Sequence, residues 1–304
     1  MFFDLHSDIL YDIVKHRLDH KKHIVRDRHL PELLEGQISG GIWCYYTDMN
    51  DPLCDIERAI DFILEELESC HDVIQIVRTK NDFHDHKINV ILGFESLLPV
   101  ESIDTFEQFI HAGFRHAMLT WNEANQYATG VDGPEHRGLT SLGQDLVRYM
   151  EAHHLIIDLS HANRQTFTDI INITEGPLLA SHSNLYRIKH HRRNLTDEQV
   201  EQIISRGGMI GLTSVPSFTA LDQASIDDII RHLNVFRDHH RLDHVGFGFD
   251  FMHYLGGKNI PGLETPRDTP NLIQKLKHYG YSESEIKRIA SENAICFIKR
   301  ILPA

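Results

Sequence analysis

We predict an α/β protein built as a single (β/α)8 barrel of the TIM type. Short apolar runs rich in β-branched and aromatic residues alternate with longer amphipathic runs, and this alternation occurs about eight times in 304 residues, a length that such a barrel takes. Parallel strands that helices cover on both faces read as continuous apolar runs, as these do. An open, doubly wound sheet is the alternative, because a strand count from one sequence carries an error of one or two.

The candidate strands are short and follow one another along the whole chain. They lie at residues 1–6, 38–46, 88–95, 116–120, 155–160, 178–182, 208–213 and 244–249. No linker rich in Pro, Gly or Ser divides them. We therefore expect one domain over residues 1–304.

Helical patterns separate the candidate strands. Between residues 55 and 70, apolar residues recur at spacings of three and four, the stripe of a helix that packs on a sheet. Thr196 with Gln199, and Ser282 with Glu285, have the spacing of a capping box, which predicts a helix start at each place.

Composition limits the partners and the compartment. Lys and Arg total 30 against 44 Asp and Glu, so the formal charge of −14 repels nucleic acid and anionic membrane surfaces. No apolar run reaches the roughly 18 residues of a spanning helix, and the first strand starts too early to leave room for a signal peptide. The four cysteines, Cys44, Cys54, Cys70 and Cys296, form no CxxC pair. We expect reduced core thiols and a cytoplasmic location.

Histidines are numerous, 23 in all, and four of them fall in the charged stretch KHRLDHKKHIVRDRHL at residues 15–30. The stretch has weak periodicity, so we expect a solvated and partly mobile segment. Adventitious metal binding and a lid over a site are the alternatives.

Ionisable residues follow the candidate strands, always at the same end. They are His6, Asp8, Glu95, His161, His182 and Asp250. Any one of them alone is more often a hydrogen-bonded structural residue. Together they lie where a barrel builds its active site, at the carboxyl ends of the strands. The shared placement favours metal binding.

Five of these side chains are too many for one tetrahedral ion with an open position, and they suit two ions. Glu95 would bridge, with His6 and Asp8 on one ion and His161 and His182 on the other. A mixed nitrogen and oxygen donor set favours zinc. Two such ions about 3.5–4 Å apart can share a water, lower its pKa and direct the hydroxide at a carbonyl carbon, which is hydrolytic chemistry.

Several segments resemble the membrane (renal) dipeptidase family of metallopeptidases in the amidohydrolase superfamily. They are DLHSDIL, LGFES, IDLSHAN, ASHSNLYRIKHHRRNLTDEQ and HVGFGFDF, and they cover nearly the whole chain in the family's order. The resemblance implies a (β/α)8 barrel, a binuclear zinc site that cleaves dipeptides, tolerance of a D-residue at the C-terminal position, and a homodimer. By motif it assigns the five residues above as ligands, Arg193 to the substrate carboxylate, and Asp250 to proton transfer or to the free amino group.

The chain departs from the family at two positions. Trp121 stands where renal-type members have a histidine that polarises the scissile carbonyl, and an indole cannot carry a proton at neutral pH. Asn122 or Asn125 could serve the oxyanion instead, with Trp121 as a flat apolar wall. Met252 replaces a second aspartate. We place Phe218 with Trp121, Asn122, Arg193 and Asp250 among the candidate substrate-binding residues.

The leading hypothesis is a zinc-dependent dipeptidase in which a bridging hydroxide attacks the peptide carbonyl and Asp250 passes a proton to the leaving amine. Glu95, as the bridge, and Asp250 are the candidate catalytic residues. One alternative is an amidohydrolase that acts on a cyclic amide, lactone or β-lactam. Another is a catalytically silent metal-binding barrel.

Overall fold

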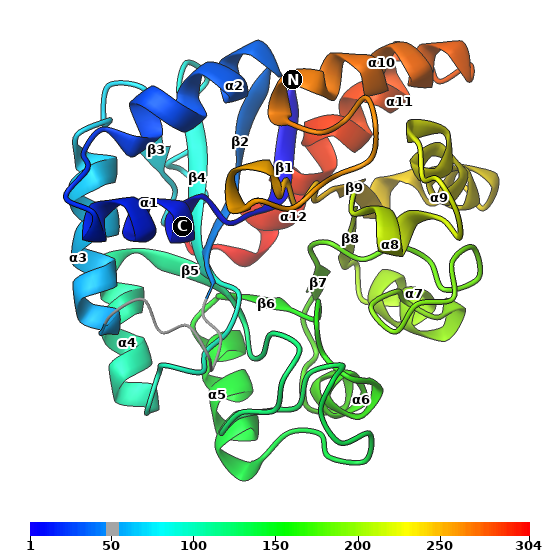
Figure 1. Ribbon diagram of the computed structural model, residues 1–304. Helices are drawn as coiled ribbons and strands as arrows, with labels where there is room; N and C mark the ends of the chain where they lie inside the picture. The colour runs from blue at the N-terminus through cyan, green and yellow to red at the C-terminus, as the bar shows by residue number, and fades with distance from the viewer. Residues whose placement is uncertain (47–54) are drawn as a thin grey trace.

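Parallel strands form a closed barrel that helices surround (Figure 1). The structure is a computed structural model, and it describes residues 1–46 and 55–304. The strands are β1 Phe2–Ser7, β2 Ile38–Tyr45, β3 Ile74–Ile76, β4 Ile88–Phe94, β5 Phe114–Met118, β6 Ile156–Asp158, β7 Leu179–Ala180, β8 Met209–Leu212 and β9 Val245–Phe247.

The ring runs in the order β2-β1-β9-β8-β7-β6-β5-β4 and closes where β4 pairs with β2. Strand β3 lies outside the ring. It pairs with the first residues of β4, Ile88 to Val90, and β5 takes over the same edge from Leu92 onward. The fold prediction, a (β/α)8 barrel, is confirmed, and each predicted strand matches one strand of the ring. The three-residue β3 is an addition that the sequence did not reveal, because so short a run has no measurable period.

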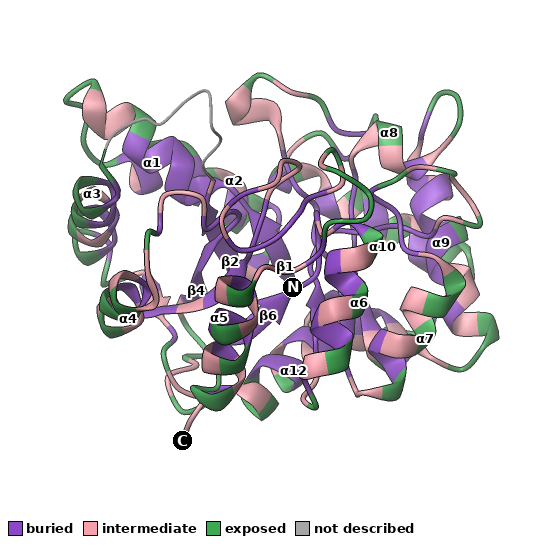
Figure 2. Cartoon of the chain, turned by 90° about the horizontal axis from the view of Figure 1, so that it is seen from below, coloured by how far each residue is buried: buried purple, intermediate pink, exposed green. Residues whose placement is uncertain are grey.

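The helices cover the outside of the ring, and their outer faces are exposed while the strands are buried (Figure 2). They are α1 Ile9–Leu18, α2 Leu30–Glu35, α3 Ile56–Glu68, α4 Ile103–Ala112, α5 Ser141–Ala152, α6 Arg164–Ile173, α7 Asp197–Ser205, α8 Pro216–Thr219, α9 Ile226–Asp238, α10 Thr269–His278, α11 Glu283–Lys287 and α12 Asn293–Ile301. The amphipathic stripe after residue 55 forms α3. Both predicted capping boxes are present, at the starts of α7 and α11.

Alternate strand residues build two cores. The larger core fills the layer between strands and helices. The smaller one takes Phe3, Ile42, Ile91 and their counterparts inside the ring and packs them against Phe297 and Ile298 of α12. One end of the barrel is therefore closed by apolar packing, and polar side chains gather at the other end.

The prediction of a solvated, partly mobile segment at residues 15–30 is wrong for its second half. Residues Val25–His29 form a π-helical turn in which Val25 and His29 are buried. His29 Nε2 lies 2.9 Å from Asp12 Oδ2, and Arg28 Nε donates to the same carboxylate. The buried carboxylate of Asp12 holds both side chains, a long-range contact that local charge patterning cannot show.

The cysteine prediction holds in part. Cys44 and Cys70 are buried free thiols, whereas Cys296 is a free thiol that is exposed. Cys296 lies on the outer face of α12, so its description as a core residue is wrong. Cys54 lies outside the described residues.

Candidate active site

Side chains that can bind a metal come from five strands and meet at the carboxyl end of the barrel. His6 lies within β1 and Asp8 just beyond it, Glu95 directly follows β4, His161 follows β6 by three residues, His182 follows β7 by two, and Asp250 follows β9 by three. All six are buried. The structure therefore brings together every residue that we predicted as a metal ligand.

Glu95 lies at the centre of this cluster. Its Oε1 is 3.6 Å from His6 Nε2, 3.0 Å from His161 Nε2 and 3.8 Å from His182 Nε2. His6 Nε2 is also 3.7 Å from Asp8 Oδ1 and 3.9 Å from Asp250 Oδ1. One carboxylate oxygen thus lies within 4 Å of histidines from three strands.

The end of β1 brings His6 and Asp8 close to each other. Strand β1 ends at Ser7, and Asp8 is the residue that precedes α1. The pairing of β1 with β2 shifts register between Asp4 and Ser7, and Asp4 Oδ1 accepts the backbone N–H of His6 across that shift. The irregular strand end and the helix start together direct both side chains to the barrel mouth.

The tautomers of the two later histidines follow from their neighbours. His161 Nδ1 donates to Asn122 Oδ1 at 2.8 Å, since an amide oxygen can only accept. His182 Nε2 accepts from Arg193 Nη2 at 2.7 Å, so the ring proton lies on Nδ1, 2.9 Å from Ser181 Oγ. In the neutral rings both Nε2 atoms therefore present lone pairs, and these two atoms are only 2.8 Å apart. Two facing lone pairs repel each other, and the guanidinium of Arg193 donates to only one of them.

Burial shifts the pKa values of the whole cluster toward uncharged forms. It raises the pKa of Asp8 to about 6 and that of Asp250 to about 7. The pKa of Glu95 is raised well above its usual range, first by burial and then by the nearby charges of Asp8 and Asp250. Burial lowers the pKa of His6 to about 3. Three crowded carboxylates are thus costly here without cations.

The cluster fits divalent metal ions. His6 Nε2 and Asp8 Oδ1 are buried and have no hydrogen-bond partner among the described residues. Two groups of three donor atoms can be drawn from the cluster, one with His6, Glu95 and His182 and one with His6, Asp8 and Asp250. Cations would satisfy the orphaned atoms, neutralise the carboxylates and separate the histidine lone pairs.

A buried carboxylate supports both histidine loops from below. Asp158 Oδ1 accepts the backbone N–H groups of Ser160 and Ser181, at 2.9 and 3.1 Å, and these residues directly precede His161 and His182. Its Oδ2 lies 2.8 Å from His116 Nε2 on β5. Asp158 therefore ties three neighbouring strands together beneath the site, as an outer partner that orients metal-binding side chains does.

Glycines let the neighbouring strands approach the His182 loop closely. A Cβ atom added to Gly211 or to Gly248 would lie 1.8 Å from the carbonyl oxygen of Ser181. No other residue type fits at either position, so these glycines set the place of the loop.

Arg193 is buried beside the cluster, and its guanidinium donates to His182 Nε2. Its Nε has no partner among the described residues. Phe218 packs 5.5 Å from the guanidinium carbon. Arg193 therefore carries spare donor capacity at the edge of the site, which suits recognition of a carboxylate.

A cavity of about 330 Å³ opens above the cluster, within the range of small-molecule sites. Its lining includes every predicted substrate-binding residue, namely Trp121, Asn122, Arg193, Phe218 and Asp250, together with Met252. Trp121 packs edge-on against Tyr46, with ring centres 5.1 Å apart, which suits a flat wall. Asn125 does not contribute, because its amide is bonded to the backbone of Leu119, Tyr127 and Ala128.

Sequence reasoning missed two cavity residues that a pattern could have revealed. Tyr11 and Lys15 follow Asp8 by three and seven residues, the spacing of one helix face, and both line the cavity. Tyr46, Val215 and Leu255 also line it, and no sequence signal distinguishes them from core residues.

A family model describes the same arrangement of motifs. The model of the membrane dipeptidases, peptidase family M19, matches residues 1–302. The chain belongs to this family. The resemblance that the sequence motifs carried is thereby confirmed, and so is the expected enzyme class, a metallo-dipeptidase that hydrolyses peptide bonds.

Curated members of the dipeptidase family are similar along most of this chain. Dipeptidase aclJ of Aspergillus oryzae is 27% identical over 287 residues, which are 87% of this chain and 68% of that protein. Dipeptidase tcpJ of Claviceps purpurea is 24% identical over 313 residues, which cover 96% of this chain and 73% of that protein.

Solved structures of related folds superpose along the full length. A metallopeptidase from Rhodobacter sphaeroides, crystallised with a phosphinate mimic of the dipeptide L-Ala-D-Ala, has a TM-score of 0.86 at 23% identity, with 99% of both chains covered. The dipeptidase AC, another metallopeptidase of family M19, has a TM-score of 0.88 at 24% identity and covers 100% of this chain and 99% of its own. Both share the fold. Within the described part of this chain, every helix is too short or too polar to cross a lipid bilayer.

Proposed function

We propose that the protein is a dipeptidase with two zinc ions per chain, bridged by Glu95. The convergence of His6, Asp8, His161 and His182 around Glu95, at the floor of a cavity, carries this proposal. The donor set of nitrogens and carboxylate oxygens favours zinc. When bound, such a pair of ions lowers the pKa of a shared water and polarises the substrate carbonyl.

The protein's own residues would place a dipeptide over this centre. Arg193 would bind the C-terminal carboxylate with a guanidinium fork, and Phe218 would pack beside that end. Asp250 lies on the floor of the cavity, where its carboxylate can pass a proton to the leaving amine or bind the free amino group. Trp121 would form a wall, while Asn122 holds the His161 ring in its orientation.

The same cavity would admit a D-residue at the C-terminal position. The Rhodobacter sphaeroides structure of the same fold holds a mimic of L-Ala-D-Ala. A homodimer, a cytoplasmic location and the absence of membrane partners stay predictions.

The bridge can be tested with Glu95→Gln. The variant should lose at least one of two zinc ions, because an amide cannot serve as an anionic bridge, and hydrolysis of L-Ala-L-Ala and L-Ala-D-Ala should fall below detection. Elemental analysis and a ninhydrin assay measure the two effects. Glu101→Gln, an exposed carboxylate on the connection after β4, is the matched control and should change neither. A Glu95→Gln protein with two zinc ions and full activity would refute the bridge.

A further inference from the structure

Lys15 brings a positive charge to the rim of the cavity. Helix α1 starts directly after Asp8, and the helical period places Tyr11 and Lys15 on the face that lines the cavity. Tyr11 is buried and Lys15 is exposed. The lysine therefore extends from the wall next to β1 into the mouth, where a substrate side chain would lie.

Among the residues that the structure describes, no carboxylate neutralises the charge of Lys15. Lys15 forms no ion pair with any carboxylate of residues 1–46 and 55–304, whereas Lys275 and Lys287 each pair with an acidic side chain. The acidic residues of the cavity, Asp8, Glu95 and Asp250, all lie at its floor around His6 Nε2. The cationic side chains that line the cavity, among the described residues, are Lys15 and Arg193.

Lys15 and Arg193 lie on different sides of the mouth. Lys15 follows β1 and Arg193 follows β7, and β9 and β8 separate these two strands in the ring of eight. Two cations on separate sides of one cavity are complementary to a ligand that has two separate anionic groups. A dipeptide supplies one such group at its C-terminus, and an acidic side chain supplies the other.

We propose that the preferred substrates are dipeptides with an acidic amino-terminal residue, whose side-chain carboxylate binds Lys15 Nζ. This inference rests on the proposed function, in which Arg193 binds the C-terminal carboxylate. With that end fixed near β7, the amino-terminal residue extends toward β1 and α1. Tyr11, Tyr46 and Leu255 line the cavity there and can pack on the methylene groups of the side chain. A lysine or arginine side chain would meet Lys15 and be repelled.

The test compares kcat/KM for L-Glu-L-Ala, L-Gln-L-Ala and L-Lys-L-Ala, with L-Ala-L-Ala as reference, on the zinc-loaded protein. The two amino-terminal residues Glu and Gln differ in charge and hardly in shape. We expect a Glu-to-Gln ratio of about ten, as one charge-assisted contact implies. The Glu-to-Gln ratio should fall toward one in Lys15→Met and persist in Lys15→Arg. In Lys15→Glu the charge preference should reverse, so that kcat/KM is higher for L-Lys-L-Ala than for L-Glu-L-Ala. Raised salt should lower it in the wild type, because exposed charges are screened.

Lys22→Met is the matched control. Lys22 is an exposed lysine beyond the end of α1 that lines no part of the cavity, so its loss removes the same charge from the chain without touching the site. The Glu-to-Gln ratio should remain that of the wild type. Circular dichroism spectra of all variants confirm that each is folded.

The outcomes separate this inference from the proposed function. Hydrolysis of L-Ala-L-Ala with a Glu-to-Gln ratio near one in the wild type overturns the role of Lys15 and leaves the dipeptidase proposal standing. A Glu-to-Gln ratio that is equal in Lys15→Met and Lys22→Met also overturns the role of Lys15 and leaves the dipeptidase proposal standing. If the zinc-loaded protein hydrolyses neither these four dipeptides nor L-Ala-D-Ala, both proposals fail.

Discussion

His161 and Asp250 adopt a backbone conformation that side chains rarely tolerate. Their φ angles are +68° and +57°, in the left-handed region, and they are the only buried residues among the seven non-glycine positions of the described chain with positive φ. Such a conformation costs about 1–2 kcal/mol. Hydrogen bonds hold it: the carbonyl of His161 accepts from Val131 N–H, and that of Asp250 accepts from Asn259 Nδ2. Both side chains are thereby turned into the mouth.

At the scale of one residue, Arg193→Met tests carboxylate recognition. Loss of a charged hydrogen bond worth about 1.5–3 kcal/mol should raise KM for dipeptides roughly 10- to 100-fold, with a smaller change in kcat. Steady-state kinetics with L-Ala-L-Ala measure both constants. Arg192→Met removes the neighbouring exposed arginine, which pairs with Asp132, and should leave KM unchanged. An unchanged KM in Arg193→Met would show that the guanidinium has another task.

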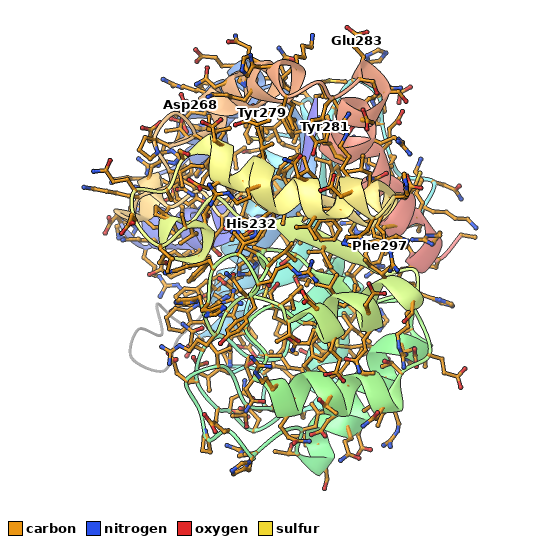
Figure 3. The ribbon with its side chains drawn as sticks, turned by 90° about the vertical axis from the view of Figure 1, so that its right-hand side faces the viewer. His232, Asp268, Tyr279, Tyr281, Glu283 and Phe297 are labelled. Atoms are coloured by element: carbon orange, nitrogen blue, oxygen red, sulfur yellow. The ribbon has the colours of Figure 1, made fainter. Side chains whose placement is uncertain are left out.

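At the scale of elements, a buried histidine joins helix α9 to two loops. His232 (labelled in Figure 3) accepts the backbone N–H of Leu185 at Nδ1, and its Nε2 donates to the carbonyl oxygen of Thr219. The bond at Nδ1 requires the neutral ring, because a protonated nitrogen cannot accept. Burial lowers the pKa of His232 to about 4, and the smaller effects of Thr219, Arg231 and Asp228 do not reverse that direction. The loop that carries Arg193 thus depends on an uncharged imidazole.

This histidine should make stability pH-dependent. Its pKa lies near 6.5 in the unfolded chain and near 4 in the folded one, so between these values the unfolded state binds more protons. The contribution of the neutral His232 ring to the free energy of unfolding is complete above pH 6.5. It is lost as the pH falls toward 4, and the loss is about 2 kcal/mol at pH 5. Urea unfolding at pH 7.5 and 5.0 measures the free energy of unfolding at each pH. Its drop between the two should be larger in the wild type than in His232→Gln by this amount.

His239→Gln is the control for that measurement. His239 is exposed at the end of the same helix, so its variant should show the wild-type drop. Equal drops in the wild type and in His232→Gln would mean that the buried ring contributes nothing to the pH dependence.

At the scale of the whole molecule, the metal centre connects strand ends around the ring. Its proposed ligands come from β1, β4, β6 and β7, and each of these strands contributes to the closed sheet. Without cations the carboxylates of Asp8, Glu95 and Asp250 repel one another in a buried site. Binding of metal should therefore stabilise the fold as well as enable catalysis.

Chelation tests this coupling. Prolonged dialysis against a chelator should lower Tm by roughly 5–10 °C, and added zinc should restore it, because a ligand that binds only the folded state stabilises that state. Differential scanning calorimetry measures the change in Tm, and this change should be smaller in Glu95→Gln than in the wild type. A Tm that is independent of chelator, in protein shown to contain zinc beforehand, would contradict the coupling.

Part of this molecule was predictable because its signals are local. Each strand of the ring appears as a continuous apolar run, α3 as an apolar stripe, and the starts of α7 and α11 as capping boxes. His6, Glu95, His161 and His182 were identifiable because barrel strands all place their carboxyl ends at one mouth. The structure shows that these residues converge, whereas their roles as metal ligands stay predictions.

Other features depend on contacts between distant segments. The carboxylate of Asp12 binds buried His29 and also Arg28, and Asp158 joins three strands beneath the histidines. The hydrophobic period and the capping residues act over a few residues, and the order of the motifs can be read along the chain. The amino-acid sequence alone therefore determined the barrel and the family. The partner of each buried polar group, and the position of Lys15 across the cavity from Arg193, arose only from tertiary structure, because closing the ring brings together residues that lie far apart along the chain.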